Sequence, residues 1–514
     1  MLTGFIFTNT NLLAKKLKVS RGEVCALLKN YMEDCSFIQW QMIDVTVVDG
    51  DLTYSLEDWH YYLPLLRDNR LGFGLDQIGA YNTPLFIIGD ESIIPMPRVI
   101  SQLIVDGEKS NLEIPADILY CFDEGCENNY EQLIQNKPYF AVGRLPIVEG
   151  MTIQFLSNYL AKSSELVPEG IQSRGAIMTT AESWVANSAQ IVSDIPKVTL
   201  SSAFVPTNND MVVCPLLNTT VDQMYQGYIH ELQKADVWVF NLHGTNEQGA
   251  SSFVGESKQS TGFPIAMQTS ILNLKAPVIF NTLACYGGRY TNYSISDSMM
   301  LSALTNGTML YCGAGHVGFF FLERIGMTNA FMKLYNIYLH QGYPAGMALI
   351  KAKQDYYVAY HAKDDDDFAI YTVLEFNLFG NPILAMRPQL DFDYQTDITK
   401  NLNNLKSQAK YRPKSATPLF DQKFKFGDLS LYVKHSADQQ LAYAYQQVVS
   451  ECQYYFHTSS MELKQVYRMS DNGYQIGFRF VFYRSEATVT SGYNMMYIAE
   501  CDMQGNNIRL MGTN

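Results

Sequence analysis

The sequence predicts an α/β protein with mostly parallel sheets, followed by a smaller α+β domain. Up to about residue 385, segments with helical periodicity alternate with short, continuously apolar runs, the pattern of strands buried on both faces of a parallel sheet. Beyond residue 388, apolar and polar residues alternate, as in antiparallel strands with one solvated face. The length of 514 residues suits about three folding units.

The first unit is predicted over residues 1–165. Its first clear helix begins at Ser20, because Glu23 stands three residues later and completes a capping box. A second helix is expected near Ser55, again with an acid at the third position. Two apolar runs end at glycine or proline and are predicted to be interior strands, 84–90 and 139–146.

The second unit is predicted over residues 166–388 and continues the same alternation. Its expected elements are a strand over 175–183, a helix capped by Thr220 and Gln223, strands over 237–244 and 276–285, a helix ending near Gly307, a strand over 308–315, and two helices within 327–360. The two most apolar of these strands end on His243 and Cys285.

Residues 389–514 are predicted to form an accessory α+β domain. Residues 401–415 are polar and basic without a strong apolar period, which indicates an exposed connection. Two alternating runs, 474–484 and 493–502, are predicted to be antiparallel strands. No candidate catalytic residue lies in this domain, so we expect it to bind a regulatory partner or ligand.

The composition excludes several function classes. Lys and Arg number 37 against 51 Asp and Glu, giving a formal net charge of −14 and no basic stripe, so a nucleic-acid partner is not expected. No segment approaches the roughly 20 apolar residues that span a bilayer, and the first residues do not resemble a secretory signal. We therefore expect a soluble, cytoplasmic protein that does not act at a membrane.

The nine cysteines are dispersed, odd in number and without a CxxC pair. This distribution indicates free thiols and predicts no metal site. Cys121 and Cys126 flank an acidic segment, but no matching His or Cys pair accompanies them. The acidic run 364–367 lacks the spaced ligands of a calcium loop, so calcium binding, a solvated loop and an autocleavage segment stay open for it.

His243 and Cys285 are the residues that carry chemistry in this pattern. Sites in open parallel sheets form where the carboxyl ends of strands meet, and both residues stand at such ends. A thiol becomes a nucleophile near neutral pH when a base such as imidazole lies beside it. Gly244 after the histidine, and the glycines 287–288 after the cysteine, let a peptide approach and leave N–H groups for a developing oxyanion.

Local motifs around the two residues resemble known cysteine peptidases. The string 284–287 (ACYG) matches part of the caspase signature, with the histidine upstream at nearly the expected interval and Leu283 in place of the usual glutamine. Over about residues 80–388 the chain resembles the gingipain family of the caspase-like clan. The segments that carry this resemblance, in the family's order, are PLFIIGDESIIP (84–95), AVGRLP (141–146), NLHGTNEQG (241–249), PVIFNTLACYGG (277–288) and NLFGNPIL (377–384).

The resemblance implies a caspase/gingipain-like fold and a cysteine endopeptidase that needs no cofactor. It implies Cys285 as the nucleophile, His243 as general base and acid, and the backbone N–H groups of Gly244 and Cys285 as oxyanion donors. Glu182 stands where gingipains carry the acid that supports the histidine. The same glutamate could instead be an acid that stabilises a helix N-terminus.

Substrate specificity is expected to differ from that of arginine-specific gingipains. Their acidic S1 residue has no counterpart in 184–187, and Asp194 replaces it only if the alignment is shifted. The candidate pocket residues are therefore Trp184, Asp194 and His316, the last because it also follows an apolar strand. Without the family's evident secretion signal and pro-segment, the chain resembles an intracellular relative, which by analogy would act in regulation or bacterial defence.

Two functions remain open at this point. The first is a cysteine endopeptidase that cleaves protein or peptide substrates through an acyl-enzyme and is regulated by a partner, a ligand or autocleavage. The second is a catalytically silent or conditionally active caspase-like scaffold, in which residues 389–514 bind a partner.

Overall fold

The structure is a computed structural model of the chain. The residues that it describes are 2–35, 38–45, 59–75, 83–105, 108–122, 138–193, 198–202, 232–244, 251–256, 265–273, 276–321, 326–361, 367–386, 415–418, 424–425, 439–455, 461–471, 474–485 and 494–513. Four sequence predictions lie outside them: the helix near Ser55, the helix capped by Thr220 and Gln223, the connection over 401–414, and most of the acidic run, 364–366.

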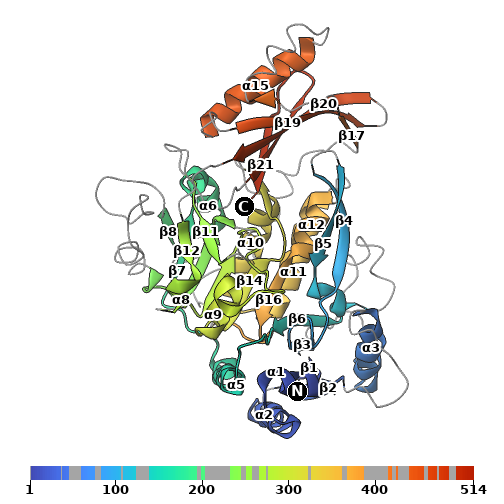
Figure 1. The fold of residues 1–514 in the computed structure, drawn as a ribbon, viewed down its shortest axis with the longest axis vertical. Coiled ribbons are helices and arrows are strands. Elements are labelled where there is room, and N and C mark those ends of the chain that lie inside the picture. Colours follow the sequence, from blue (N-terminus) through green and yellow to red (C-terminus); the bar gives the residue numbers. More distant parts are fainter. Residues whose placement is uncertain are drawn as a thin grey trace.

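One ten-stranded sheet runs through both predicted α/β units, in the order β2-β1-β3-β6-β16-β14-β13-β9-β7-β8 (Figure 1). Its strands are β1 (Leu2–Thr8), β2 (Ile38–Asp44), β3 (Thr83–Ile88), β6 (Phe140–Leu145), β7 (Ala176–Thr180), β8 (Val198–Ser202), β9 (Val237–Asn241), β13 (Ile279–Thr282), β14 (Leu310–Ala314) and β16 (Phe376–Gly380). The predicted α/β class with a mostly parallel sheet is confirmed. By strand direction the sheet has two halves, β2-β1-β3-β6-β16 and β14-β13-β9-β7-β8, so β16 of the predicted second unit lies in the same half as the strands of the first.

The halves run in opposite directions. Every neighbouring pair of strands in the sheet is parallel except β14 and β16, which pair antiparallel from Leu310↔Gly380 to Ala314↔Phe376. The carboxyl ends of β7, β9, β13 and β14 therefore share one edge, whereas β1, β3 and β6 end at the opposite edge. A site built from strand ends at one edge can draw on only one half of the sheet.

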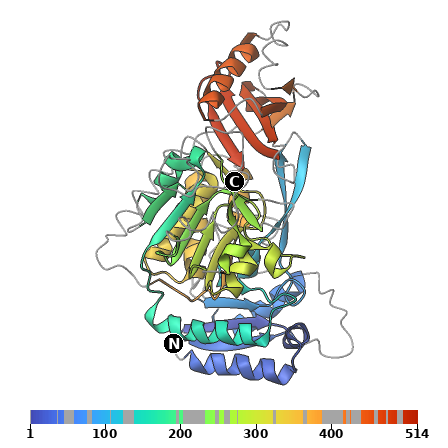
Figure 2. The same ribbon diagram turned by 60° about the vertical axis from the view of Figure 1, so that its left-hand side comes forward.

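Helices cover the sheet on both faces (Figures 1 and 2). They are α1 (Thr10–Leu17), α2 (Arg21–Asp34), α3 (Tyr62–Gly72), α5 (Ile153–Glu169), α6 (Val185–Val192), α8 (Thr269–Leu272), α9 (Met299–Thr305), α10 (Met327–His340), α11 (Ala345–His361) and α12 (Asp367–Glu375), with 3-10 turns η1 (Trp59–Tyr61), η2 (Asp117–Cys121), η4 (Glu182–Trp184) and η5 (Ile295–Asp297). All residues of α10 are buried, so this helix belongs to the core. None of the helices in the described ranges is long and apolar enough to cross a membrane.

The capping box predicted at Ser20 is present at the start of α2. The Ser20 hydroxyl accepts from the Glu23 N–H at 3.2 Å, and the Glu23 carboxylate accepts from the Ser20 N–H at 2.9 Å. These bonds satisfy donors that a helix N-terminus otherwise leaves open.

A second, antiparallel sheet of seven strands forms most of the C-terminal region, and α15 (Gln439–Tyr455) packs against it. Its strands are β15 (Phe319–Phe321), β17 (Ser415–Pro418), β18 (Phe424–Lys425), β19 (Met461–Asp471), β20 (Tyr474–Ser485), β21 (Asn494–Asp502) and β22 (Arg509–Thr513). We call it the C-terminal sheet. It lies at one end of the molecule, with α1 and α2 at the other (Figures 1 and 2).

The C-terminal sheet is joined to the α/β region by a strand of that region. Strand β15 follows β14 in the chain, yet it pairs with β22, with Phe320 opposite Gly512. Four fully buried apolar side chains meet along this junction and belong to one cluster with the core of the C-terminal sheet: Trp184, Val254, Phe320 and Tyr497. We call these four the seam cluster.

Two small antiparallel sheets complete the fold. Strands β4 (Arg98–Val105) and β5 (Glu108–Pro115) form a hairpin that extends toward the C-terminal sheet (Figures 1 and 2). Strands β10 (His243–Gly244), β11 (Ser252–Val254) and β12 (Ile265–Gln268) form a three-stranded sheet directly after β9. This second small sheet carries the predicted catalytic histidine.

Candidate active site

The predicted site residues stand at the carboxyl ends of four neighbouring parallel strands, β7, β9, β13 and β14. Strand registers align Thr180 with Asn241 and Phe240 with Thr282. The residues that follow these strands therefore emerge at the same edge of the sheet: Glu182, His243, Cys285 and His316.

Cys285 lies on a tight turn at this edge. The Gly287 N–H donates to the Ala284 carbonyl at 3.0 Å, and the Tyr286 N–H donates to the His316 carbonyl at 2.8 Å. Tyr286 adopts a left-handed conformation with φ of 56°, which costs a non-glycine residue about 1 kcal/mol. The neighbouring hydrogen bonds hold this conformation, and they present Cys285 beyond the end of β13.

The backbone of Gly244 lies against the Cys285 peptide. A Cβ atom at Gly244 would stand 1.7 Å from the Cys285 carbonyl oxygen and 2.9 Å from its nitrogen, so only glycine fits. His243 precedes this glycine, and β10 fixes its position by pairing His243 with Val254 of β11. The structure thus brings the predicted His-Gly and Ala-Cys segments together. That Gly244 and Cys285 donate to an oxyanion stays a prediction.

His243 is 1% exposed and contacts a carboxylate that the sequence did not reveal as a partner. Its Nε2 lies 3.3 Å from Oε2 of Glu256, which is fully buried. The other carboxylate oxygen of Glu256 accepts from the Tyr497 hydroxyl of β21 at 3.1 Å. Glu256 stands two residues after Val254, so the acid directly follows the short strand that pairs with His243.

The structure describes the backbone of Glu182 but no part of Asp194. Glu182 begins η4, whose Ser183 N–H donates to the Glu256 backbone carbonyl at 3.4 Å, so the two acids belong to adjoining segments. The side chain of Glu182 lies outside what the structure describes, and Asp194 lies outside the described residues altogether. Their predicted roles, as supporting acid and pocket acid, stay predictions.

Trp184 is packed directly on His243. Its ring centroid lies 4.3 Å from that of His243 at 70° and 4.5 Å from that of Phe320. Trp184 is fully buried here, between the imidazole and the C-terminal sheet. In this arrangement Trp184 is a wall of the site, and the other members of the seam cluster cover it.

His316 lies on the other side of Cys285. Its Nδ1 is 2.9 Å from the Tyr371 hydroxyl, and its ring centroid is 5.2 Å from that of Tyr286. Burial, with a smaller contribution from Arg289, lowers the pKa of His316 to about 4. The ring is therefore neutral at physiological pH, which suits a pocket wall and not a proton donor.

The Cys285 sulfur is held by the segment that leads into β15. Sγ accepts from the Gly318 N–H at 3.3 Å and lies 3.7 Å from the Gly318 carbonyl oxygen. Burial raises the pKa of the Cys285 thiol far above its ordinary value, while the Gly318 N–H lowers it in part. In this arrangement, with Cys285 only 4% exposed, the thiol is protonated at neutral pH.

Glu375, at the end of α12, is a further buried acid at this edge. Its backbone carbonyl accepts from the Gly315 N–H at 2.8 Å, just beyond β14. Neither carboxyl oxygen has a hydrogen-bond partner among the described residues. Burial raises the pKa of Glu375 well above its usual range, and Lys353 opposes this in part. Burial of Glu375 behind the site therefore favours the neutral carboxylic acid over the carboxylate.

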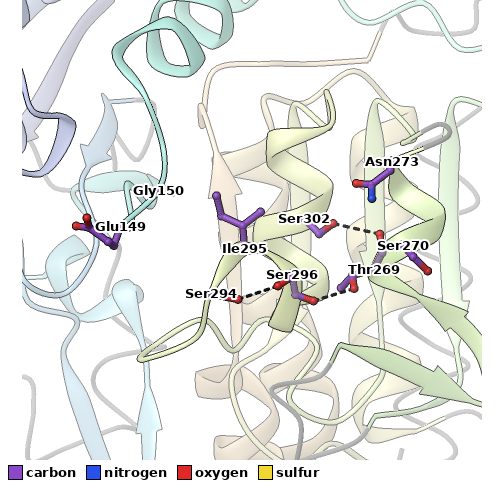
Figure 3. Close-up of a pocket in the computed structure, with 9 residues that line it drawn as sticks. All are labelled: Glu149, Gly150, Thr269, Ser270, Asn273, Ser294, Ile295, Ser296 and Ser302. Carbon is purple, nitrogen blue, oxygen red and sulfur yellow. Dashed lines mark hydrogen bonds between the residues drawn. The ribbon is translucent and has the colours of Figure 1, made fainter.

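Metal ligands and a cavity are the two other features that bear on a site in the described parts of the chain. Within those parts, no three His, Cys, Asp or Glu side chains come together as metal ligands. A cavity of about 460 Å³ opens near α8 and α9 (Figure 3). Its lining residues, none of them a predicted site residue, are Glu149, Gly150, Thr269, Ser270, Asn273, Ser294, Ile295, Ser296 and Ser302.

A model of a known protein family matches the α/β region of the chain. Residues 78–387, more than half of the chain, match the model of "Peptidase family C25". This match defines the class as a cysteine-type peptidase, a hydrolase. The chain belongs to peptidase family C25, the gingipain family of the caspase-like clan, so the resemblance found in the sequence is confirmed.

No curated protein matches the sequence. One similar solved structure is named "Structure of Protease"; it shares 9% sequence identity and a TM-score of 0.47, over 99% of this chain and 97% of that one.

Proposed function

We propose that the protein is a cysteine endopeptidase in which Cys285 and His243 form the catalytic dyad. The observation that supports this proposal is the approach of Gly244 to the Cys285 peptide, because it brings together the backbone segments that carry the two predicted residues. Their strand-end positions and the family membership support it.

The proposed reaction uses protein or peptide substrates and needs only side chains and water. His243 takes the Cys285 proton, the thiolate attacks the scissile carbonyl carbon, and a tetrahedral oxyanion forms. When the C–N bond breaks, His243 gives its proton to the leaving amine. Water, deprotonated by His243, then hydrolyses the thioester and releases the acid product and the free thiol. The N–H groups of Gly244 and Cys285 are the proposed oxyanion donors.

The pocket beside the dyad is proposed to accept an uncharged residue at P1. Trp184 is an aromatic wall, and His316 is neutral because burial lowers its pKa to about 4. Neither group supplies the carboxylate that would attract a basic side chain.

Activity is proposed to be regulated through the C-terminal sheet by a partner, a ligand or cleavage, within the cytoplasm. Cys285 and His243 are both buried, and Gly318, adjacent to β15, holds the sulfur. A substrate carbonyl can reach the thiol only if the segment of Gly318 moves. The arrangement therefore corresponds to a restrained enzyme.

Cleavage of a denatured protein pool tests the proposal. We expect Cys285→Ala and His243→Ala to lower the cleavage rate at least about 10³-fold, because each removes one half of a unit that acts together. Cys25→Ala is the control, since Cys25 lies half-buried on α2. Equal cleavage by wild type and Cys285→Ala contradicts the proposal.

A second candidate function is a caspase-like scaffold that is silent or only conditionally active. The protonated, buried thiol favours it, because such a thiol does not attack a carbonyl. An electrophilic peptide probe separates the two. Labelling of Cys285 in the full chain supports the peptidase, whereas no labelling with any partner, ligand or proteolytic treatment supports the scaffold.

A further inference from the structure

Four contacts connect the C-terminal sheet to the imidazole of His243. Tyr497 of β21 donates to Oε1 of Glu256 at 3.1 Å, and Oε2 of the same carboxylate lies 3.3 Å from His243 Nε2. Trp184 packs against the imidazole and against Phe320 of β15. All five side chains are at most 2% exposed.

We propose that Glu256 is the positioning residue of His243, and that Tyr497 of the C-terminal sheet holds Glu256 in that role. The proposal rests on the proposed peptidase function and deepens it. It gives Glu256 a supporting role of the kind that the resemblance implied for Glu182, and it makes the C-terminal sheet a working part of the site.

An acid beside the histidine serves the chemistry of a cysteine–histidine dyad in two ways. A carboxylate at Nε2 holds the Nε2–H tautomer, which leaves Nδ1 as the ring nitrogen that exchanges protons with the thiol and the leaving group. The same negative charge stabilises the imidazolium that forms when Cys285 loses its proton. Glu256 meets both requirements because its second oxygen is occupied by Tyr497 and its side chain cannot swing to solvent.

The position of Glu256 is fixed from two directions. Its backbone carbonyl accepts from the Ser183 N–H of η4 at 3.4 Å, and the preceding strand β11 pairs with β10, which carries His243. In the described parts of the chain, three titratable groups face this contact. They are Glu256, which follows β11, Tyr497 on β21, and Cys285, which lies on the far side of Gly244.

The experiment compares four variants in the full chain: Glu256→Gln, Glu256→Asp, Tyr497→Phe and Glu182→Gln. The first readout is the pH titration of the His243 ring by NMR with ¹³C-labelled histidine, assigned with His243→Ala; it needs no substrate. The second is the separate measurement of kcat and KM on a peptide that wild type cleaves.

We expect Glu256→Gln to lower the midpoint of the His243 titration, because the negative charge beside the ring is gone. We expect kcat to fall about 10- to 100-fold with KM changed less than about threefold, since the carboxylate acts on proton transfer and not on substrate binding. Glu256→Asp should restore part of the midpoint and of kcat. Tyr497→Phe should shift both in the same direction, by about two- to fivefold in kcat.

Tyr483→Phe is the matched control, since that hydroxyl lies in the same sheet but faces the Met496 sulfur at 3.8 Å. The proposal is overturned if Glu256→Gln leaves the His243 midpoint at the wild-type value, or if Glu182→Gln alone produces the shift. If Glu256→Gln fails to fold, Tyr497→Phe carries the same test. A wild type whose Cys285 is not labelled by an electrophilic peptide probe under any partner, ligand or proteolytic treatment refutes the peptidase function, while the His243 titration still decides the role of Glu256.

Discussion

The two halves of the ten-stranded sheet treat buried charge in opposite ways. In the first half, the Arg144 guanidinium donates to both oxygens of Asp117, at 2.7 and 2.6 Å, and to three backbone carbonyls. Beside the end of β14 in the second half, Glu375 is equally buried, but neither carboxyl oxygen is bonded within the described residues. The comparison separates a buried group that stabilises the fold from one whose burial at the edge of the predicted site is unfavourable.

The family motifs fall into two groups in the same way: one stabilises the fold, and the others place side chains at strand ends. Arg144 belongs to AVGRLP, and its partners are backbone atoms and a buried acid, so this motif serves the fold. The motifs around His243 and Cys285 instead place side chains at strand ends beside glycine. A motif that identifies a family is therefore not by itself a motif of its active site.

Removing Arg144 should have the largest effect on stability. We expect Arg144→Met to lower the free energy of unfolding by about 3–5 kcal/mol, because it leaves the Asp117 carboxylate buried without its counter-charge. Urea unfolding followed by circular dichroism measures this. Arg174→Met is the control, since that guanidinium pairs with Asp236 while largely exposed, and it should cost much less. Equal costs at the two sites would show that burial of the pair is irrelevant.

Loosening the seam cluster should expose the thiol. Phe320→Ala is expected to cost about 3 kcal/mol of stability and to raise the iodoacetamide labelling rate of Cys285 about tenfold, because β15 leads directly from Gly318. Phe480→Ala, on β20 against Tyr445 of α15, is the control: it should destabilise similarly without changing the labelling rate. Parallel increases in both variants would contradict a specific link through β15.

Substitution of Glu375 should have the smallest effect on stability, and that effect depends on pH. Its folded-state pKa is raised, so the folded protein binds the proton more tightly than the unfolded chain, and stability falls as pH rises above about 4.3 toward the folded-state pKa. Glu375→Gln removes this loss. The free energy of unfolding of Glu375→Gln should match that of wild type near pH 4 and exceed it by about 1–2 kcal/mol at pH 8.

Thermal unfolding between pH 4 and 8 measures the difference for Glu375→Gln. The exposed acid Glu33 on α2 offers the control variant Glu33→Gln, which should not change with pH in this way. A Glu375→Gln difference that is constant over the pH range would show that Glu375 does not titrate across it.

Much of the fold could be predicted from the sequence, because strands buried on both faces appear as uninterrupted apolar runs. The runs ending at Gly89, Leu145 and Cys285 all contain strands of the sheet. The reversed direction of the two halves could not be predicted, since an apolar run does not reveal which way its strand pairs. Strand β15 is similar: Phe319–Phe321 looks like part of the core, and its pairing with β22 depends on residues far along the chain.

The candidate site was predictable only in part. His243 and Cys285 were found because each follows an apolar strand, and such ends converge in a parallel sheet. Glu256 was missed because its contact depends on the short pairing of β10 with β11, which has too few residues for a periodic pattern. An acid just after a short apolar run that follows His-Gly was the one available signal.

The pairing of β15 with β22 also has a consequence for synthesis. The ribosome completes β15 well before β22, so the growing chain passes through a stage in which Phe320 and Trp184 have no apolar cover. During that interval the nascent protein exposes aromatic side chains next to His243. A chaperone that binds apolar segments at this stage would protect the chain from aggregation until β22 covers them.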